Sequence, residues 1–144
     1  MDAPKYFTVD EANALVPALE SAFQRILALR VQLRAAGAEL GKLGEPTDAE
    51  GLAREGGTPE ARAARGKARA LLETLGEELH GLGELGVQVK DIDTGLCDFV
   101  ARRDGRDVYL CWRMGEKQVE FWHELSAGFA GRQPIDGAFA RSLH

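Results

Sequence analysis

The residues best suited to bind or transform a ligand lie in the second half of the chain. There, acidic, basic and imidazole side chains are interleaved with tryptophans, a mixture that lines many ligand sites. An arginine stacked on a tryptophan could hold a small anion, because a guanidinium group binds carboxylates and phosphates through parallel hydrogen bonds. The candidate ligand-binding residues are Asp98, Trp112, Arg113, Glu116, Trp122, His123, Glu124 and Arg132.

The same residues also have a purely structural interpretation. Asp98 and Arg113 are expected to be diagonal neighbours on one sheet face, close enough for an ion pair. Such a pair would lock a hairpin and do no chemistry, and charged networks are often only architectural. No catalytic residue is assigned from the sequence, and whether the protein is an enzyme stays open.

Metal binding is not predicted from the histidines. His123 and Glu124 are adjacent, and neighbouring residues of a strand point to opposite faces, so these two side chains cannot converge on one ion. The remaining histidines are His80 and His144, and the chain has no H-x-x-x-H pair. Because histidine-poor chains seldom build a metal site, we predict neither a metal nor another cofactor.

Two cysteines, Cys97 and Cys111, lack the spacing of a disulfide framework or of a metal-binding knuckle. A catalytic thiol would need a neighbouring base or cation to lower its pKa, and neither cysteine shows one in the sequence. The predicted sheet register places them on opposite faces, which excludes a disulfide between them. They are expected to be small buried hydrophobes with free thiols in a reducing compartment.

Length, charge and hydropathy narrow the class of protein. A chain of 144 residues with 44% hydrophobic and 28% charged residues fits a single globular domain spanning 1–144. The net charge of −5 and the pI near 5.2 argue against a nucleic-acid partner, which would favour a clustered basic face. The first residues, 1–6, contain no apolar run, and no stretch of about 18 apolar residues occurs, so we expect a cytoplasmic protein without membrane contact.

A helical hairpin is predicted over residues 8–86. Its first helix begins with a capping box formed by Thr8 and Glu11. Pro17 interrupts the apolar pattern, so we expect a kink near Asn13 or a short first helix that restarts at Pro17.

The first helix is expected to end before Gly37, and residues 37–57 form a glycine-rich segment with at most one weak helical turn. We expect this segment to be a mobile loop. The second helix begins at Thr58, which is followed by a proline at the first helical position, and ends at Gly86.

The second helix carries a groove that could receive another helix. Gly76, His80 and Gly83 follow one line beside the leucine stripe, so a partner backbone could approach closely. We therefore predict self-association, as a homodimer, through the helical hairpin. The alternative is that the glycines reflect only a poorly optimised helix.

A small antiparallel sheet is predicted over residues 87–125, because the apolar pattern changes there from a period of 3.6 to one of two. Asp104-Gly105 suits a two-residue turn, which places Phe99 opposite Leu110 and Cys97 opposite Trp112 on one apolar face. A second turn at Gly115-Glu116 would add a third strand.

That third strand, over residues 118–125, would place His123 opposite Val108 at the edge of the same apolar face. A short helix in this stretch is the alternative, because Val119, Trp122 and His123 also fit helical spacing. Residues 126–144 are expected to be an irregular closing segment followed by a tail.

Several stretches of this sequence resemble one bacterial family. They include the string from Val108 to Glu116, Trp122-His123-Glu124 and Gly128-Phe129-Ala130-Gly131-Arg132, together with the opening Tyr6 to Asn13. On these residues the chain resembles the bacterial "domain of unknown function 2203" family. The resemblance implies a small stand-alone bacterial cytoplasmic protein and brings no reaction, substrate or catalytic residue.

Together these patterns predict an α+β protein in which a long antiparallel helical hairpin packs on a small antiparallel β-meander. The function expected from the sequence is a small binding or interaction module without catalytic activity. The alternative is an enzyme or a receptor for a small anionic ligand that uses the region of Trp112, Arg113, Trp122 and His123.

Overall fold

The computed structural model describes residues 5–143, which form two compact units. The first unit contains the described residues up to Phe23 together with those from Gly81 onward, and the second unit contains Gln24 to His80. Met1 to Pro4 and His144, considered above for export and for metal binding, lie outside the described residues.

The first unit opens with the predicted capped helix. In α1 (Val9–Ala14) the Thr8 Oγ1 accepts a hydrogen bond from the Glu11 backbone N at 3.1 Å, and Glu11 Oε1 accepts one from the Thr8 N at 3.0 Å. The helix ends at Ala14, and α2 (Val16–Lys42) begins after one residue. The expected restart beside Pro17 is therefore confirmed, since a proline in the first turn leaves no intrahelical donor unpaired.

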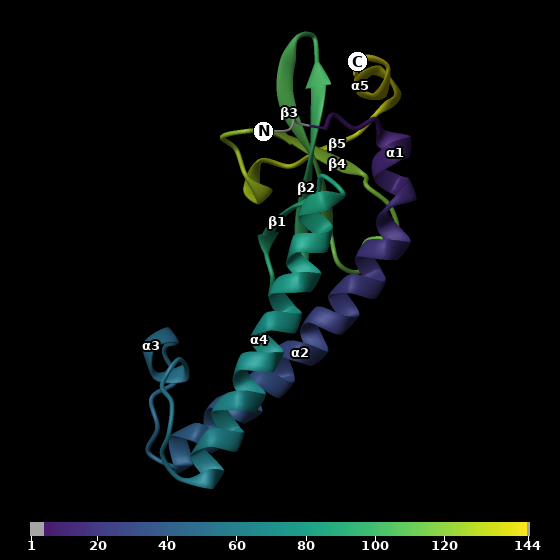
Figure 1. Cartoon of the computed structure of the whole chain (residues 1–144). Helices are drawn as coiled ribbons and strands as arrows, with labels where there is room; N and C mark the ends of the chain where they lie inside the picture. The colour runs from purple at the N-terminus through teal and green to yellow at the C-terminus, as the bar shows by residue number, and fades with distance from the viewer. Residues whose placement is uncertain (1–4, 144) are drawn as a thin grey trace. The chain divides into compact units, whose positions relative to one another are not determined.

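Five antiparallel strands form one sheet in which neighbours follow chain order (Figure 1). The strands are β1 (Gln88–Asp91), β2 (Leu96–Arg103), β3 (Arg106–Arg113), β4 (Phe121–Glu124) and β5 (Gln133–Pro134). The predicted pairing of β2 with β3 is confirmed, and the residues of its turn, Asp104 and Gly105, have φ values of 51° and 75°. These positive values are those that a type I′ turn requires.

The two faces of the sheet carry different kinds of side chain. One face carries Cys97, Phe99, Leu110 and Trp112, and we call it the first face. All four residues are fully buried, as predicted. Phe7 meets Phe99 edge-on with centroids 5.1 Å apart, and Phe23 of α2 lies 6.3 Å from Trp112. The second face carries Asp98, Val100, Tyr109, Cys111, Phe121 and His123.

The predicted register of the third strand is wrong by one residue. β4 is a strand, as favoured above, but His123 pairs with Tyr109 instead of Val108 and so belongs to the second face. The cause is the connection before β4, which runs over residues 114–120 and is not a two-residue turn. The backbone of this connection is held by Trp112, whose Nε1 donates to the Glu116 carbonyl at 2.9 Å, and by Asn13, which accepts from the Val119 N at 2.6 Å.

The structure adds regular elements that the sequence analysis did not predict. The closing segment contains β5 and a short helix, α5 (Gly137–Arg141), capped by Asp136.

In the second unit α2 does not end before Gly37 but continues to Lys42, because the packing of Ala36 and Leu40 outweighs the roughly 1 kcal/mol that a helical glycine costs. The weak helical turn expected in the segment that follows is α3 (Ala49–Leu52).

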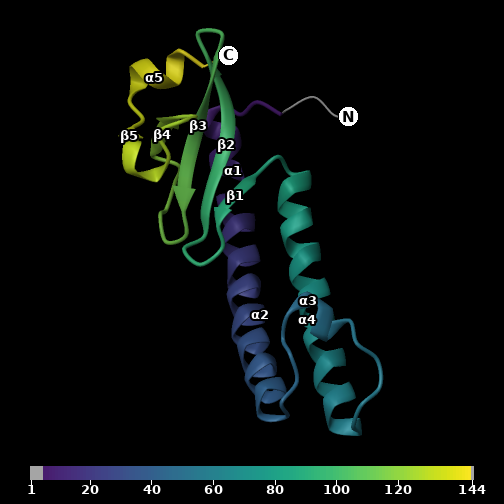
Figure 2. The ribbon, with the colours of Figure 1, turned by 90° about the vertical axis from the view of Figure 1, so that its left-hand side faces the viewer.

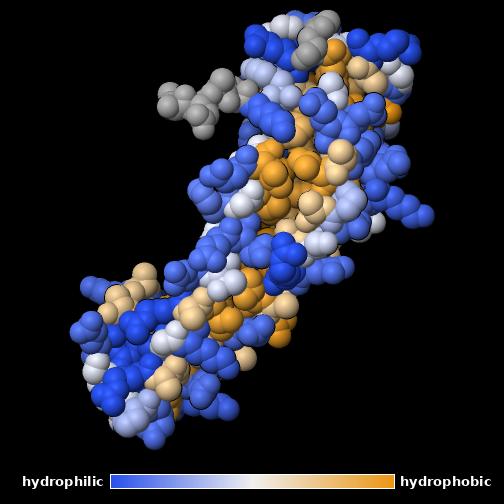
Figure 3. Space-filling model, turned by 45° about the vertical axis from the view of Figure 1, so that its right-hand side comes forward, coloured by the Kyte–Doolittle hydropathy of each residue, from blue (hydrophilic) through white to orange (hydrophobic). Residues whose placement is uncertain are grey.

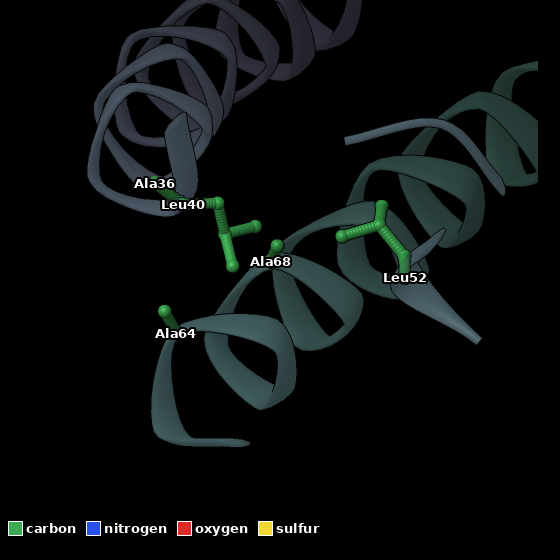
Figure 4. Packing of buried hydrophobic residues seen from close by; sticks show 5 residues of the cluster. All are labelled: Ala36, Leu40, Leu52, Ala64 and Ala68. Carbon is green, nitrogen blue, oxygen red and sulfur yellow. The ribbon is translucent and has the colours of Figure 1, made fainter. Parts of the chain in front are cut away.

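The second unit is an antiparallel helix pair, as predicted. Here α2 lies beside α4 (Pro59–Glu84), with Arg25 bound to Glu78 near one end and Leu40 packed against Ala64 and Ala68 near the other (Figure 4). Arg65 is buried and donates to the backbone carbonyls of Arg54 and Gly56, which ties the segment containing α3 to α4 (Figure 2).

Both long helices end in the same way. Gly44 after α2 and Gly86 after α4 have φ values of 72° and 91°, and the residue after each glycine donates back to Leu40 O or Leu82 O. This is the hydrogen-bond pattern of a Schellman cap. None of the helices in the described residues is both long enough and apolar enough to cross a membrane.

Replacing glycines inside α4 by alanine should stabilise the protein. A Cβ added at Gly66 or at Gly76 would meet no atom within 4 Å, so Gly66→Ala and Gly76→Ala should each raise the free energy of unfolding by about 0.5–1 kcal/mol through better helix propensity. Gly86→Ala is the matched control, because its positive φ and a Phe7 ring atom 3.1 Å from the new Cβ should make it destabilising. Urea unfolding curves measure all three, and a Gly76→Ala variant less stable than the wild type would contradict the expectation.

Candidate functional site

A buried polar cluster lies on the second face of the sheet, formed by Asp98, Cys111 and His123. These residues are 3%, 0% and 2% exposed, respectively. The His123 Nε2 lies 3.1 Å from Asp98 Oδ1, and one ligand-type atom from each of the three side chains lies within 4.8 Å of the other two. We call this group the second-face cluster.

The register of the three central strands explains how the second-face cluster forms. Asp98 of β2 pairs directly with Cys111 of β3, and residues paired in this way point to the same face. His123 of β4 pairs with Tyr109, one row further along that face. The imidazole therefore reaches diagonally over Cys111 to meet Asp98.

The hydrogen bonds of His123 determine which of its ring nitrogens carries a proton. Nδ1 lies 2.7 Å from the Glu124 carbonyl oxygen, which can only accept, so Nδ1 must donate. Nε2 then faces Asp98 Oδ1 at a distance where two lone pairs would repel each other. In the metal-free protein a proton shared between the imidazole and the carboxyl group therefore lies between Nε2 and Oδ1.

The cysteines are poor nucleophiles in this fold. Desolvation by burial, followed by the charge of Asp98, raises the pKa of the Cys111 thiol to about 12, and the same two causes in the same order raise the pKa of Cys97 to about 12. Cys97 lies on the first face, so the predicted absence of a disulfide is confirmed.

A second charged group borders the cluster. Arg132 Nη2 donates to both carboxylate oxygens of Glu116 at 2.8 Å, and Glu116 Oε1 also accepts from the Arg113 backbone N at 2.7 Å. The Arg132 guanidinium lies over the rings of Phe121 and Phe129, at 4.0 and 4.7 Å from their centroids. Its Nε is buried without a hydrogen-bond partner in the part of the chain that the structure describes.

Arg113 occupies a shallow cavity on the same face. The ion pair expected between Asp98 and Arg113 is not formed, because Asp98 is bound to His123 while the Arg113 guanidinium lies 5.4 Å from the Phe129 ring centroid. Around it is a cavity of about 190 Å³ lined by Asp91, Thr94, Leu96, Arg113 and Phe129.

The other predicted site residues lie elsewhere. Trp112 and Trp122 belong to the first face, where Trp122 stacks on Phe139 with centroids 4.5 Å apart. Glu124 forms an ion pair with Arg106 at 2.9 Å, with both side chains well exposed. The structure thus brings together Asp98, His123, Arg113, Glu116 and Arg132 on one face but separates them from both tryptophans.

Sequence reasoning missed Cys111, Phe121 and Phe129 as members of this region. A signal for Cys111 was present, because the confirmed β2–β3 register already placed it opposite Asp98. Phe121 and Phe129 take the place expected for the tryptophans beneath the arginines, and no sequence signal distinguished them.

The raised thiol pKa values predict slow chemistry at both cysteines. At pH 8 each native thiol should contain about a thousandfold less thiolate than a free cysteine, so a disulfide reagent should label neither cysteine in the native protein and both in guanidinium. Labelling should accelerate as the pH rises towards 12, since ionisation of the thiol is limiting. Stoichiometric labelling of native protein at pH 8 would contradict this environment for the cysteines.

Comparison with known proteins shows one relationship, to a protein family. No curated protein and no solved structure matches the chain. A family model matches residues 5–135, a range that contains the whole second-face cluster together with Arg113, Glu116 and Arg132. The resemblance read from the sequence is confirmed, and the chain belongs to the family described as "Uncharacterized conserved protein (DUF2203)".

Proposed function

We propose that this protein binds a divalent transition metal, with zinc as the preferred ion, through Asp98, Cys111 and His123. The observation that carries the proposal is the convergence of a carboxylate oxygen, a thiol sulfur and an imidazole nitrogen within 4.8 Å of one another. Three strands contribute one ligand each, so the rigid sheet itself positions them.

The donor set matches zinc chemistry. Zinc is bound in proteins by cysteine sulfur at about 2.3 Å, histidine nitrogen at about 2.0–2.1 Å and carboxylate oxygen at about 2.0–2.2 Å. In a tetrahedral site these lengths separate the nitrogen and oxygen ligands by about 3.3 Å. The observed separation of 3.1 Å between His123 Nε2 and Asp98 Oδ1 is close to that value.

The second hydrogen bond of His123 also supports a metal ligand. A metal-bound histidine almost always donates its other ring N–H to a carbonyl, a carboxylate or water, which fixes the ring and its tautomer. Nδ1 donates in this way to the Glu124 carbonyl, and Nε2 is left aimed at Asp98 and Cys111. A cation at this point would replace the shared proton.

Charge balance favours a divalent ion at this depth. A charge buried away from water is costly unless it is compensated. An ionised Asp98 and a Cys111 thiolate would neutralise a divalent cation, with His123 as a neutral ligand. The three ligands leave one coordination position for water or a further ligand, as in zinc sites that are not purely structural. The proposal concerns binding, and no reaction is assigned.

The central prediction is that reduced protein binds one equivalent of Zn²⁺ and that Cys111→Ala weakens this binding by more than about 100-fold. Loss of a direct ligand should exceed the 10–100-fold effect that is typical when a residue hydrogen-bonded to a metal ligand is removed. Competition with a chromophoric chelator measures the affinity, and the thiolate-to-metal absorption of the Co²⁺ form reports the sulfur ligand directly.

Cys97→Ala is the matched control, because Cys97 is equally buried but lies on the first face of the sheet. It should leave both the affinity and the Co²⁺ absorption unchanged. His80→Ala is the corresponding control for His123→Ala. Equal loss of metal in the two cysteine variants, or reduced wild-type protein that takes up no metal, would refute the proposal.

A second candidate function is supported by the cavity around Arg113. In the described residues the Arg113 guanidinium has no carboxylate partner, and it lies against Phe129, which is 41% exposed. A cation on an aromatic ring beside an open cavity suits a small carboxylate or phosphate, the anionic ligand expected from the sequence. Asp91 also lines this cavity, so a ligand that carries an amino group as well would be complemented.

This receptor hypothesis predicts that a small anion stabilises the protein and that Arg113→Gln removes the effect. Ligand binding to the native state raises the melting temperature by mass action, so a panel of carboxylates and phosphates can be screened by thermal shift. Arg106→Gln, which removes an exposed arginine bound to Glu124, is the matched control. A panel without any shift, or equal shifts in Arg113→Gln, would exclude the hypothesis.

Location and self-association also remain proposals. We place the protein in a bacterial cytoplasm, because its two free thiols and the proposed thiolate ligand require a reducing compartment. Self-association through the helical hairpin is supported by exposed apolar side chains such as Val31, 63% exposed. In the space-filling view apolar patches lie among the polar surface of the helices (Figure 3).

A further inference from the structure

An apolar cavity of about 430 Å³ lies within the second unit, between α2 and α4. Its walls include Leu33 and Leu40 of α2 and Leu72 and Leu75 of α4. The segment containing α3 closes one end, where Leu52 packs on Ala68 (Figure 4). The volume falls within the range of about 300–1,000 Å³ that is typical of small-molecule sites.

The cavity is extended along the helices. Arg30, Leu33, Gly37 and Leu40 recur at the spacing that gathers one face of a helix, and the distance along the helix axis from Arg30 to Leu40 is about 15 Å. A Cβ added at Gly37 would meet no atom within 4 Å, so the glycine leaves open space along this wall. An apolar space that extends along the helices in this way suits a linear hydrocarbon chain.

The polar part of the lining carries positive charge. Arg30 and Arg34 both line the cavity, and no acidic residue does. In the described part of the chain the Arg34 guanidinium has no hydrogen-bonded partner, whereas Arg30 already takes part in an interaction within the chain. On a protein whose net charge is −5, an arginine without such a partner at the edge of an apolar cavity is a local feature that favours an anionic group.

We propose that this cavity binds a soluble single-chain anionic amphiphile of the fatty-acid class. The hydrocarbon chain would lie along Leu33, Leu40, Leu72 and Leu75, and the carboxylate would meet Arg34. A second copy of this chain fits the cavity less well, because two such faces would bring the arginines of both copies together. This site is separate from the proposed metal site, and neither proposal depends on the other.

Calorimetric titration with dodecanoate below its micellar concentration tests the proposal. We expect one molecule bound per chain, with no binding of acetate, which lacks the tail, and much weaker binding of dodecyltrimethylammonium, which has a cationic head. Arg34→Glu should weaken dodecanoate at least about tenfold, since a charge-assisted hydrogen bond is lost and a repulsion gained. Arg62→Glu, which changes an arginine outside this cavity, should leave the affinity for dodecanoate unchanged.

Gly37→Leu fills the cavity without removing any contact, and leucine favours a helix more than glycine does. It should abolish dodecanoate binding while the protein stays folded. Gly41→Leu is the matched control, because its Cβ also enters open space but Gly41 does not line the cavity. Equal binding by the two glycine variants would overturn the proposal.

Three other outcomes would also overturn it. The first is the absence of dodecanoate binding to the wild type, and the second is equal affinity for the cationic amphiphile. The third is a change of molar mass by light scattering in Gly37→Leu, which would identify the cavity as an interface between copies. In the first of these cases, co-sedimentation with anionic vesicles would assign the surface to membranes instead.

Discussion

The two-residue turn at Asp104 and Gly105 is the constraint on which the sheet and the candidate site depend. Because the side chains of a strand alternate between faces, this turn decides for sixteen strand positions at once which side chains share a face. It assigns Phe99, Leu110 and Trp112 to the first face, where aromatic residues of the N-terminal segment cover them. By the same step it assigns Asp98 and Cys111 to the second face, so the apolar core and the polar cluster have one origin.

Local signals were enough to predict most of the fold. The capping box at Thr8, the break beside Pro17 and the glycine after α4 each act within a few residues, so the sequence alone could locate them. The end of α2 could not be located in this way, since the burial of Leu40 against α4 depends on residues far away in the chain. For the same reason β5, whose residues pair with β4, could not be predicted.

Most residues of the candidate site were predicted, but their arrangement was not. The reason is that the predicted pairing of β4 with β3 was wrong by one residue. A slip of one position moves every side chain of a strand to the other face. With β4 in the wrong register His123 appeared at the edge of the apolar face, and a convergence with Asp98 and Cys111 could not be foreseen. The true register depends on hydrogen bonds made by Trp112 and Asn13 to the preceding loop, which no pattern of hydrophobicity encodes.

The proposed metal-binding role would explain the burial of the second-face cluster better than a contribution to stability does. A buried ion pair repays little more than the cost of removing its charges from water, and apolar side chains of similar volume often serve a core as well or better. Asp98 and His123 nonetheless lie at the centre of a covered face, beside a cysteine that burial keeps protonated. A metal ion at the proposed site would change this balance, because its bonds to the three side chains would contribute free energy that a shared proton does not. The ion would then offset the cost of burying three polar groups.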